Sequence, residues 1–215
     1  MNLFQPVIAQ AIAQGVSEET IILLLLLPLV ASLVAAARHL VGFRGFGILI
    51  PMAIAVTFVA TGIATGMLVF LTILTIATLI RRFLEKFRLH YLPRMALLLW
   101  FVSLGILGLI LAAPFLKLGP LTTISIFPIV ILILMAEEFI AVQIRKSFRE
   151  AANLTVETII LAFLGYLVFS LNCLRNFALN YPLWVVLIPF FFNLWVGRFT
   201  GLRLLEYWRF RKILR

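Results

Sequence analysis

The chain has 215 residues, of which 64% are hydrophobic and only 12% are charged. This composition excludes a soluble globular domain, which needs a charged surface. A helix crosses the hydrocarbon core of a bilayer with about 20 apolar residues, so seven crossings would use most of the chain. We therefore expect an all-α, polytopic integral membrane helix bundle with no room for a separate soluble domain.

Long apolar runs follow one another along the sequence. They are continuous, as in residues 21–34 and 124–136, whereas the strands of a transmembrane barrel alternate apolar and polar residues. The pattern predicts about seven transmembrane helices, at residues 19–38, 43–61, 63–83, 94–115, 121–142, 153–172 and 180–198. We expect residues 1–18 to form a short extracytoplasmic lead, residues 19–200 the membrane domain, and residues 201–215 a basic amphipathic tail.

Glycines and prolines interrupt this pattern. The stretch from residue 45 to residue 80 is too long for one span, and Thr61-Gly62 with Thr65-Gly66 supplies the turn that divides it. Four prolines fall inside expected spans, where each should kink its helix and release a backbone carbonyl. These prolines are Pro28, Pro51, Pro128 and Pro189.

Basic residues are divided unevenly between the two expected sides of the membrane. With seven spans, sixteen of the 18 Lys and Arg residues fall on the side of the C-terminal tail, and only Lys117 and Arg175 fall opposite. Because positively charged loops stay in the cytoplasm, we expect the N-terminus outside and the C-terminus inside. The chain would then be a multi-pass protein of a bacterial or archaeal cytoplasmic (inner) membrane. Topology explains its net charge of +10 without a nucleic-acid partner.

Three acidic residues fall inside expected spans toward the cytoplasmic side, namely Glu137, Glu138 and Glu157. A charge at mid-bilayer costs about 2.5–3.5 kcal/mol, and less near the interface. These carboxylates should therefore face the bundle interior beside a partner such as Arg38 or Arg44, with the turn of Glu137 and Glu138 near that of Glu157. Two interpretations stay open, a proton- or cation-binding site and structural ion pairing at the cytoplasmic rim.

The connection between the first two spans combines basic residues with glycines. Its members are Arg38, His39, Gly42, Arg44, Gly45 and Gly47. Glycines beside arginines can bring backbone N–H groups close to an anion such as phosphate or carboxylate, although the Gly-Lys-Ser/Thr ending of a P-loop is missing. A tight membrane turn with arginines reaching toward the interface explains the same residues equally well.

The candidate functional rim joins this connection to residues of the later spans. It comprises Arg38, Gly42, Arg44, Gly47, Pro51, Arg94, Pro128, Glu137, Glu138 and Glu157. A second candidate, the basic tail, is expected to lie on the inner leaflet or to bind a cytoplasmic partner, although a plain stop-transfer anchor would look similar. Its members are Arg198, Arg203, Glu206, Trp208, Arg209 and Arg211.

Catalytic patterns are missing from the sequence. There is no aspartate, no Gly-x-Ser-x-Gly and no His-Glu-x-x-His, and both histidines fall at the expected cytoplasmic boundary. The single cysteine, Cys173, can form no disulfide within the chain. We expect no catalytic residue, no metal and no cofactor.

Several motifs resemble a known bacterial family, in matching order along nearly the whole chain from residue 15. They are Val41-Gly-Phe-Arg-Gly-Phe-Gly-Ile-Leu-Ile-Pro51, Ala60-Thr-Gly62, Tyr91-Leu-Pro-Arg-Met95, Ser125-Ile-Phe-Pro-Ile129, Glu137-Glu138-Phe139 and the closing segment 197–211, with its Gly-Arg-x-Thr-Gly-x-Arg-Leu-x-Glu pattern. They resemble the seven-helix domain of the family described as inactive transglutaminase fused to seven transmembrane helices. The Gly-Ile-x-x-Pro turn is also distantly similar to the small membrane subunit of polyglutamate capsule synthesis.

This resemblance implies a helical bundle that carries an extracytoplasmic transglutaminase-like domain, in agreement with an outside N-terminus. Only 18 residues precede the first expected span, so that domain would be a separate protein or the chain would be a minimal member. Genes of the family tend to lie beside ATP-grasp ligases, which implies a ligase as cytoplasmic partner. No catalytic residue comes with the resemblance.

Two functions follow as hypotheses. The first is a non-catalytic membrane scaffold or export subunit of a peptide- or polyglutamate-type envelope system, which docks a cytoplasmic ATP-grasp-like ligase or its acidic product. The alternative is a small secondary transporter that uses the intramembrane glutamates. Either could act as a homo-oligomer in the lipid bilayer.

Overall fold

The computed structural model describes residues 4–84, 86–87, 89–115 and 125–198. Within these ranges the regular structure is helical throughout, as the sequence predicts. The chain divides into two compact units. The terminal unit consists of Met1–Val56 and Val156–Arg215, and the central unit of Thr57–Thr155. The boundaries between the units fall inside two helices, α3 (Leu49–Thr61) and α7 (Phe148–Ser170).

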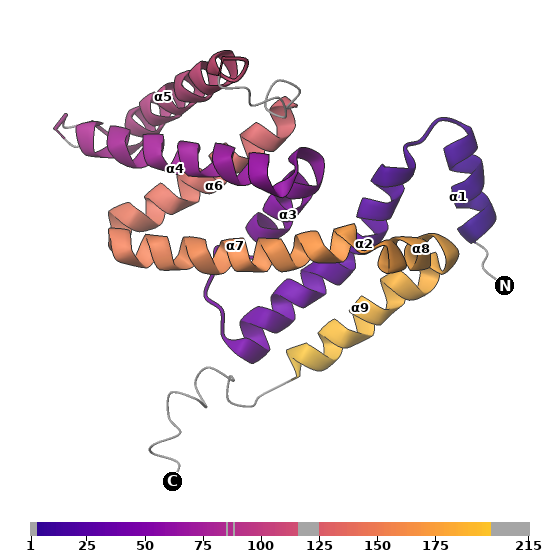
Figure 1. The fold of residues 1–215 in the computed structure, drawn as a ribbon. Helices are drawn as coiled ribbons and strands as arrows, with labels where there is room; N and C mark the ends of the chain where they lie inside the picture. Colours follow the sequence, from indigo (N-terminus) through magenta and orange to yellow (C-terminus); the bar gives the residue numbers. More distant parts are fainter. Residues whose placement is uncertain (1–3, 85, 88, 116–124, 199–215) are drawn as a thin grey trace, which may run out of the picture. The chain divides into compact units, whose positions relative to one another are not determined.

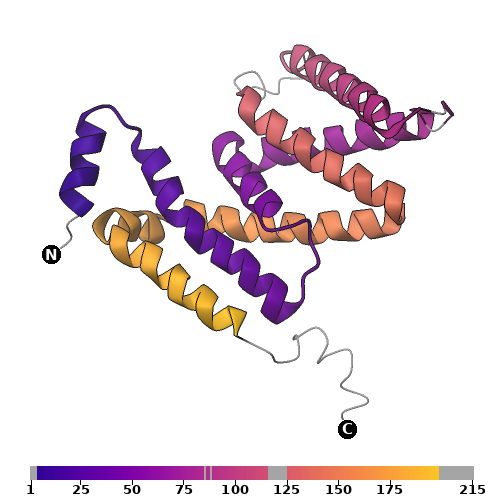
Figure 2. The same cartoon turned by 180° about the vertical axis from the view of Figure 1, so that it is seen from behind.

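The terminal unit is built around α2 (Glu18–Ala36), which ends in a π-helical turn, η1 (Ala37–Val41). Helix α9 (Pro182–Gly197) runs alongside α2, and α8 (Asn172–Asn180) lies beside α1 (Phe4–Ala13), as both views show (Figures 1 and 2). Ser17 occupies the N-cap position of α2, and the acidic pair Glu18 and Glu19 follows in the first turn. Negative charge there is favoured by the positive end of the helix dipole.

Small residues let α7 approach its neighbours in this unit. A Cβ added at Gly165 of α7 would lie 2.9 Å from Val30 Cγ1 of α2 and 3.0 Å from Ala55 Cβ of α3. Such close backbone approach is a common basis of helix packing in membranes, where the hydrophobic effect supplies little between helices. The α2 face at this contact is apolar and buried, with Leu26 and Val30 fully covered.

One polar contact adds to this apolar packing. The side-chain amide of Asn193 in α9 donates a hydrogen bond to Ser32 Oγ in α2 over 2.7 Å. The Ser32 hydroxyl in turn donates to the Pro28 carbonyl over 2.8 Å. A bond between spans of this kind contributes about 0.6–2 kcal/mol in membrane bundles, and it fixes the register of α9 on α2.

The central unit contains α4 (Ile63–Leu84), α5 (Tyr91–Ala112) and α6 (Ile126–Arg145), with α4 in contact with both of the others. Gly62 separates α3 from α4 with a φ of 79°, so the chain turns at the break that the glycines predict. A Cβ at Gly105 of α5 would lie only 2.2 Å from Ile76 Cδ1 of α4. Gly105 thus leaves room for the end of the Ile76 side chain against α5.

Five helices are long and apolar enough to cross a membrane, counted over the described ranges. They are α2 with η1 (Glu18–Val41), α4, α5, α6 and α7. Helices α8 and α9 are bent by 106° from each other and add a sixth span if they are counted as one. Helix α3 is apolar but has only 13 residues. The count of seven spans and their orientation therefore stay predictions.

Two prolines differ from expectation. Pro51 and Pro128 were expected to kink the interior of a span, but each is the third residue of its helix, α3 and α6 respectively. The first-turn N–H groups of a helix have no partner within the helix, so proline costs little there. Pro28 and Pro189 do lie inside α2 and α9. Residues 43–48, predicted as the start of the second span, form a loop before α3.

Candidate functional site

The loop between η1 and α3, residues 42–48, is here called the glycine loop. Gly42 ends the π-helical turn with a φ of 105°, and its N–H donates to the Ala37 carbonyl over 3.1 Å. Gly47 has a φ of 45°. Both conformations lie in the left-handed region that glycine adopts without strain, so these two glycines shape the turn. π-Helical turns occur frequently at functional sites.

Two side chains of helix α7 accept hydrogen bonds from the backbone of the glycine loop. The N–H of Phe46 donates to Thr158 Oγ1 over 2.8 Å, and the N–H of Arg44 donates to the Glu157 carboxylate. We call these two bonds the loop clamp. The Phe46 N–H is buried, and a buried donor without an acceptor costs about 1–3 kcal/mol, so the clamp supplies an acceptor that this part of the loop needs.

Gly45 makes the loop clamp sterically feasible. A Cβ at this position would lie 2.8 Å from Thr158 Oγ1 and 3.3 Å from the Thr158 backbone. Gly45 and Thr158 are both buried, and Thr158 is fully covered. Gly45 therefore allows the loop to approach α7 closely. Gly42 and Gly47 have a different role, because their positive φ angles set the direction of the chain.

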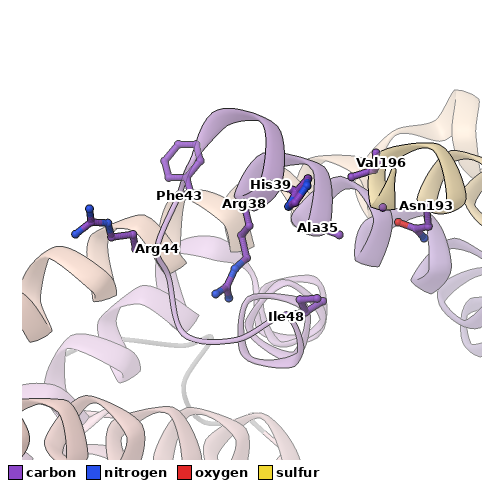
Figure 3. Close-up of a pocket in the computed structure, with 9 residues that line it drawn as sticks. Ala35, Arg38, His39, Phe43, Arg44, Ile48, Asn193 and Val196 are labelled. Carbon is purple, nitrogen blue, oxygen red and sulfur yellow. The ribbon is translucent and has the colours of Figure 1, made fainter. Parts of the chain in front are cut away.

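A pocket of about 490 Å³ lies beside the glycine loop, between the end of α2 with η1 and the end of α9. Its lining combines basic, amide and apolar residues. They are Ala35, Arg38, His39, Phe43, Arg44, Ile48, Asn193, Val196 and Gly197. Figure 3 shows the Arg38 guanidinium in the space between Phe43 and Ile48 of the glycine loop, whereas the Arg44 side chain points away from this space. The Ser32–Asn193 bond fixes the α9 side of this pocket.

The Arg38 side chain is the most unusual group in the pocket. Its Nη1 atom is buried and has no hydrogen-bond partner among the described residues. Leaving a buried donor without an acceptor costs about 1–3 kcal/mol, and more for a charged group. Arg38 thus brings a guanidinium nitrogen without a described partner to the lining of the pocket, which suits an anionic group.

A sequence model of the family described as 7 transmembrane helices usually fused to an inactive transglutaminase matches residues 11–214. The chain belongs to this family. No curated protein and no solved structure matches the chain significantly. The glycine loop, the loop clamp and every residue that lines the pocket lie inside the matched range, so the site is part of the family's seven-helix domain.

The predicted rim residues of this family domain divide between the two units. Six belong to the terminal unit: Arg38, Gly42, Arg44, Gly47, Pro51 and Glu157. Four belong to the central unit: Arg94, Pro128, Glu137 and Glu138. The structure brings Arg38 and Arg44 together at one pocket and joins Glu157 to the Arg44 backbone. The proximity of Glu137 and Glu138 to Glu157 stays a prediction.

The environments of the acidic residues differ. Glu157 is half-buried, and its carboxylate accepts a hydrogen bond from the Arg44 backbone N–H. In α6, Glu137 is half-buried and Glu138 is exposed. Over the described ranges, no three His, Cys, Asp or Glu side chains gather in a way that could hold a metal ion.

The predicted tail site lies almost entirely outside the described residues. Only Arg198 is described, as an exposed residue that follows the last turn of α9. Arg203, Glu206, Trp208, Arg209 and Arg211 are not among the described residues. A role of the tail in binding lipid or a partner stays a prediction.

Sequence reasoning missed Thr158, Ser32 and Asn193. Each is a polar residue inside a long apolar helix, and polar groups there normally find a partner on another helix. That rule could have marked all three as contact residues, but it could not have paired Ser32 with Asn193 or Thr158 with the glycine loop.

We predict that Gly45→Ala destabilises the protein by about 1–3 kcal/mol, because the added methyl group would overpack against Thr158 and weaken the loop clamp. Thermal unfolding of the purified protein in mild detergent measures this effect. A loss of this size should lower Tm by about 2–10 °C.

The matched control is Gly108→Ala in α5. A Cβ at Gly108 meets nothing within 4 Å, and alanine is the better helix former, so Tm should stay unchanged or rise. Equal Tm values for the two variants would contradict the role assigned to Gly45.

Proposed function

We propose that the chain is a non-catalytic membrane module whose basic end faces the cytoplasm and docks a soluble acidic partner. The partner would be an ATP-grasp-like ligase of a peptide- or polyglutamate-type envelope system, or the acidic product of that ligase. On the other side of the membrane, the module would work with the transglutaminase-like domain to which members of its family are usually fused.

The observation that carries this proposal is the separation of charge within the terminal unit. Arg38, His39 and Arg44 gather where α2 and α9 both end. At the opposite end of α2, Arg175 of α8 lies 3.9 Å from Glu19. Helices α2 and α9 thus end on the same side. This agrees with an odd number of membrane crossings, counted from α2 through α9. Basic residues concentrate at that side, as the positive-inside rule requires of a cytoplasmic face.

The proposed docking surface is the basic tail beyond α9, which begins after Arg198. A segment with several basic residues attracts acidic surfaces over roughly a Debye length, about 8 Å at physiological ionic strength. Docking by such a segment should therefore weaken as salt increases.

We predict that changing Arg203, Arg209 and Arg211 together to Gln abolishes co-purification of the cytoplasmic partner, because the attraction to acidic groups is lost. Affinity purification from mild detergent, followed by identification of the proteins retained at low and high salt, measures this.

The control changes Lys117 and Arg175 to Gln, the two basic residues expected on the opposite side. It should retain the partner. Retention by the triple tail variant as well would contradict the docking proposal.

A second candidate is a small secondary transporter. The sharp bend of 106° between α8 and α9 favours it, because interrupted helices commonly build substrate sites in transporters. The buried Gln143 of α6 adds a side-chain oxygen without a hydrogen-bond partner among the described residues. Glu157 fits this function less well, since its carboxylate already accepts the Arg44 N–H.

A proton-coupled transporter should lose gradient-driven uptake in liposomes when Glu137 and Glu138 are both changed to Gln, because a glutamine side chain cannot carry the proton. The measurement compares uptake with and without an imposed proton gradient. A matched control is Glu150→Gln, which removes a carboxylate that forms an ion pair with Lys146 near the end of α6. The transporter function would be contradicted if uptake did not depend on the proton gradient and persisted in the Glu137→Gln, Glu138→Gln variant.

A further inference from the structure

The pocket at the glycine loop has the size and the lining of a ligand site. Its volume of about 490 Å³ falls in the range of roughly 300–1,000 Å³ that is typical of small-molecule sites. One part of the lining is polar, with Arg38, His39 and the Asn193 amide, whereas the Arg44 side chain points away (Figure 3). The other part is apolar, and includes Ala35, Phe43, Ile48 and Val196. A ligand that fits both parts carries an anionic group next to an apolar one.

We propose that this pocket binds the phosphoryl group of an anionic amphiphile, with the Arg38 guanidinium as the principal ligand-binding group. The buried Nη1 of Arg38 has no acceptor among the described residues, and its side chain extends into the space between Phe43 and Ile48, which both line the pocket (Figure 3). A guanidinium group presents two parallel N–H donors that match two oxygens of a phosphate group.

Charge within the pocket supports an anion. Among the described residues, the lining includes two arginines and a histidine but no carboxylate. Glu157 accepts the Arg44 N–H but does not line the pocket. An anionic ligand would therefore meet the Arg38 guanidinium and an amide donor, Asn193, that is itself fixed by its bond to Ser32.

The location of the pocket favours a phosphoryl group over other anions. The pocket lies at the end of α2 and η1, a helix long and apolar enough to cross a membrane, and so at the level of lipid headgroups. Phosphate is the most abundant anionic group at that depth, and basic pockets between transmembrane helices are known to bind phospholipid headgroups. A soluble organic phosphate has the same chemistry, and the experiment separates the two sources.

The test titrates the full-length protein in mild detergent with three probes. They are short-chain phosphatidylglycerol, glycerol phosphate and glutarate, a dicarboxylate without phosphorus. Thermal unfolding and native mass spectrometry measure binding. We expect saturable binding of phosphatidylglycerol that Arg38→Gln weakens by about 10- to 100-fold, the usual range for a lost charge-assisted contact.

Two further variants keep the result interpretable. Arg38→Lys retains the positive charge but lacks the planar pair of N–H donors, so it should also weaken binding. If Arg38→Gln does not fold, the Arg38→Lys variant decides the test. Arg145→Gln removes an exposed arginine from the last turn of α6 and should bind like the unchanged protein.

Each outcome has a defined meaning. Tighter binding of phosphatidylglycerol than of glycerol phosphate supports a lipid source, and equal binding supports a soluble phosphate. Glutarate binding as tightly as either, no saturable binding of phosphate-bearing probes, or wild-type binding by both Arg38 variants would overturn the proposal. This inference does not depend on partner docking, because the tail variants should bind the phosphate-bearing probes normally.

Discussion

The cost of placing charge in hydrocarbon governs how the terminal unit is arranged. An ionised side chain at mid-bilayer costs a few kcal/mol even on the most lenient scales, so charged residues collect at helix ends. Arg38, His39 and Arg44 accordingly gather beside the glycine loop, and Glu19 and Arg175 approach each other at the other end of α2. The pocket, the proposed docking tail and the proposed orientation all follow from this separation.

A second constraint, the satisfaction of backbone N–H groups, determines the shape of the basic end. The chain leaves the helix at Gly42 and re-enters one only at Leu49, so the N–H groups of the loop between them lack the partners that a helix would supply. Glu157 and Thr158 accept two of these donors, and Gly45 allows the required approach. This arrangement makes Glu157 an anchor of the loop and leaves Arg38 to face the pocket.

The local pattern of the amino-acid sequence predicted most of the long helices of this protein. Apolar runs predicted α2, α4, α5, α6 and α7 to within a few residues at most ends, and the Thr61-Gly62 pair predicted the break before α4. Arg38 and Arg44 were identified as a candidate anion site because basic residues and glycines are adjacent in the sequence. The family was recognised from motifs, and the match over residues 11–214 confirms it.

Features that depend on distant residues could not be predicted. The Phe46–Thr158 bond joins residues 112 apart, and no local signal pairs them. Pro51 and Pro128 were placed inside spans because hydropathy does not show where an apolar helix begins. The rim was predicted as one site, and because Glu137 and Glu138 belong to a different unit from Glu157, their proximity stays a prediction.

The orientation of the basic end is the claim on which the functional account depends, and the chain's single cysteine offers a direct measurement. Cys173 is exposed in α8, at the end opposite the pocket. A membrane-impermeant maleimide added to intact spheroplasts should label Cys173 at once. With Cys173→Ser, a cysteine substituted at Arg198 should react only after the membrane is permeabilised. Labelling of the Arg198 position from outside, with Cys173 protected until permeabilisation, would contradict the account.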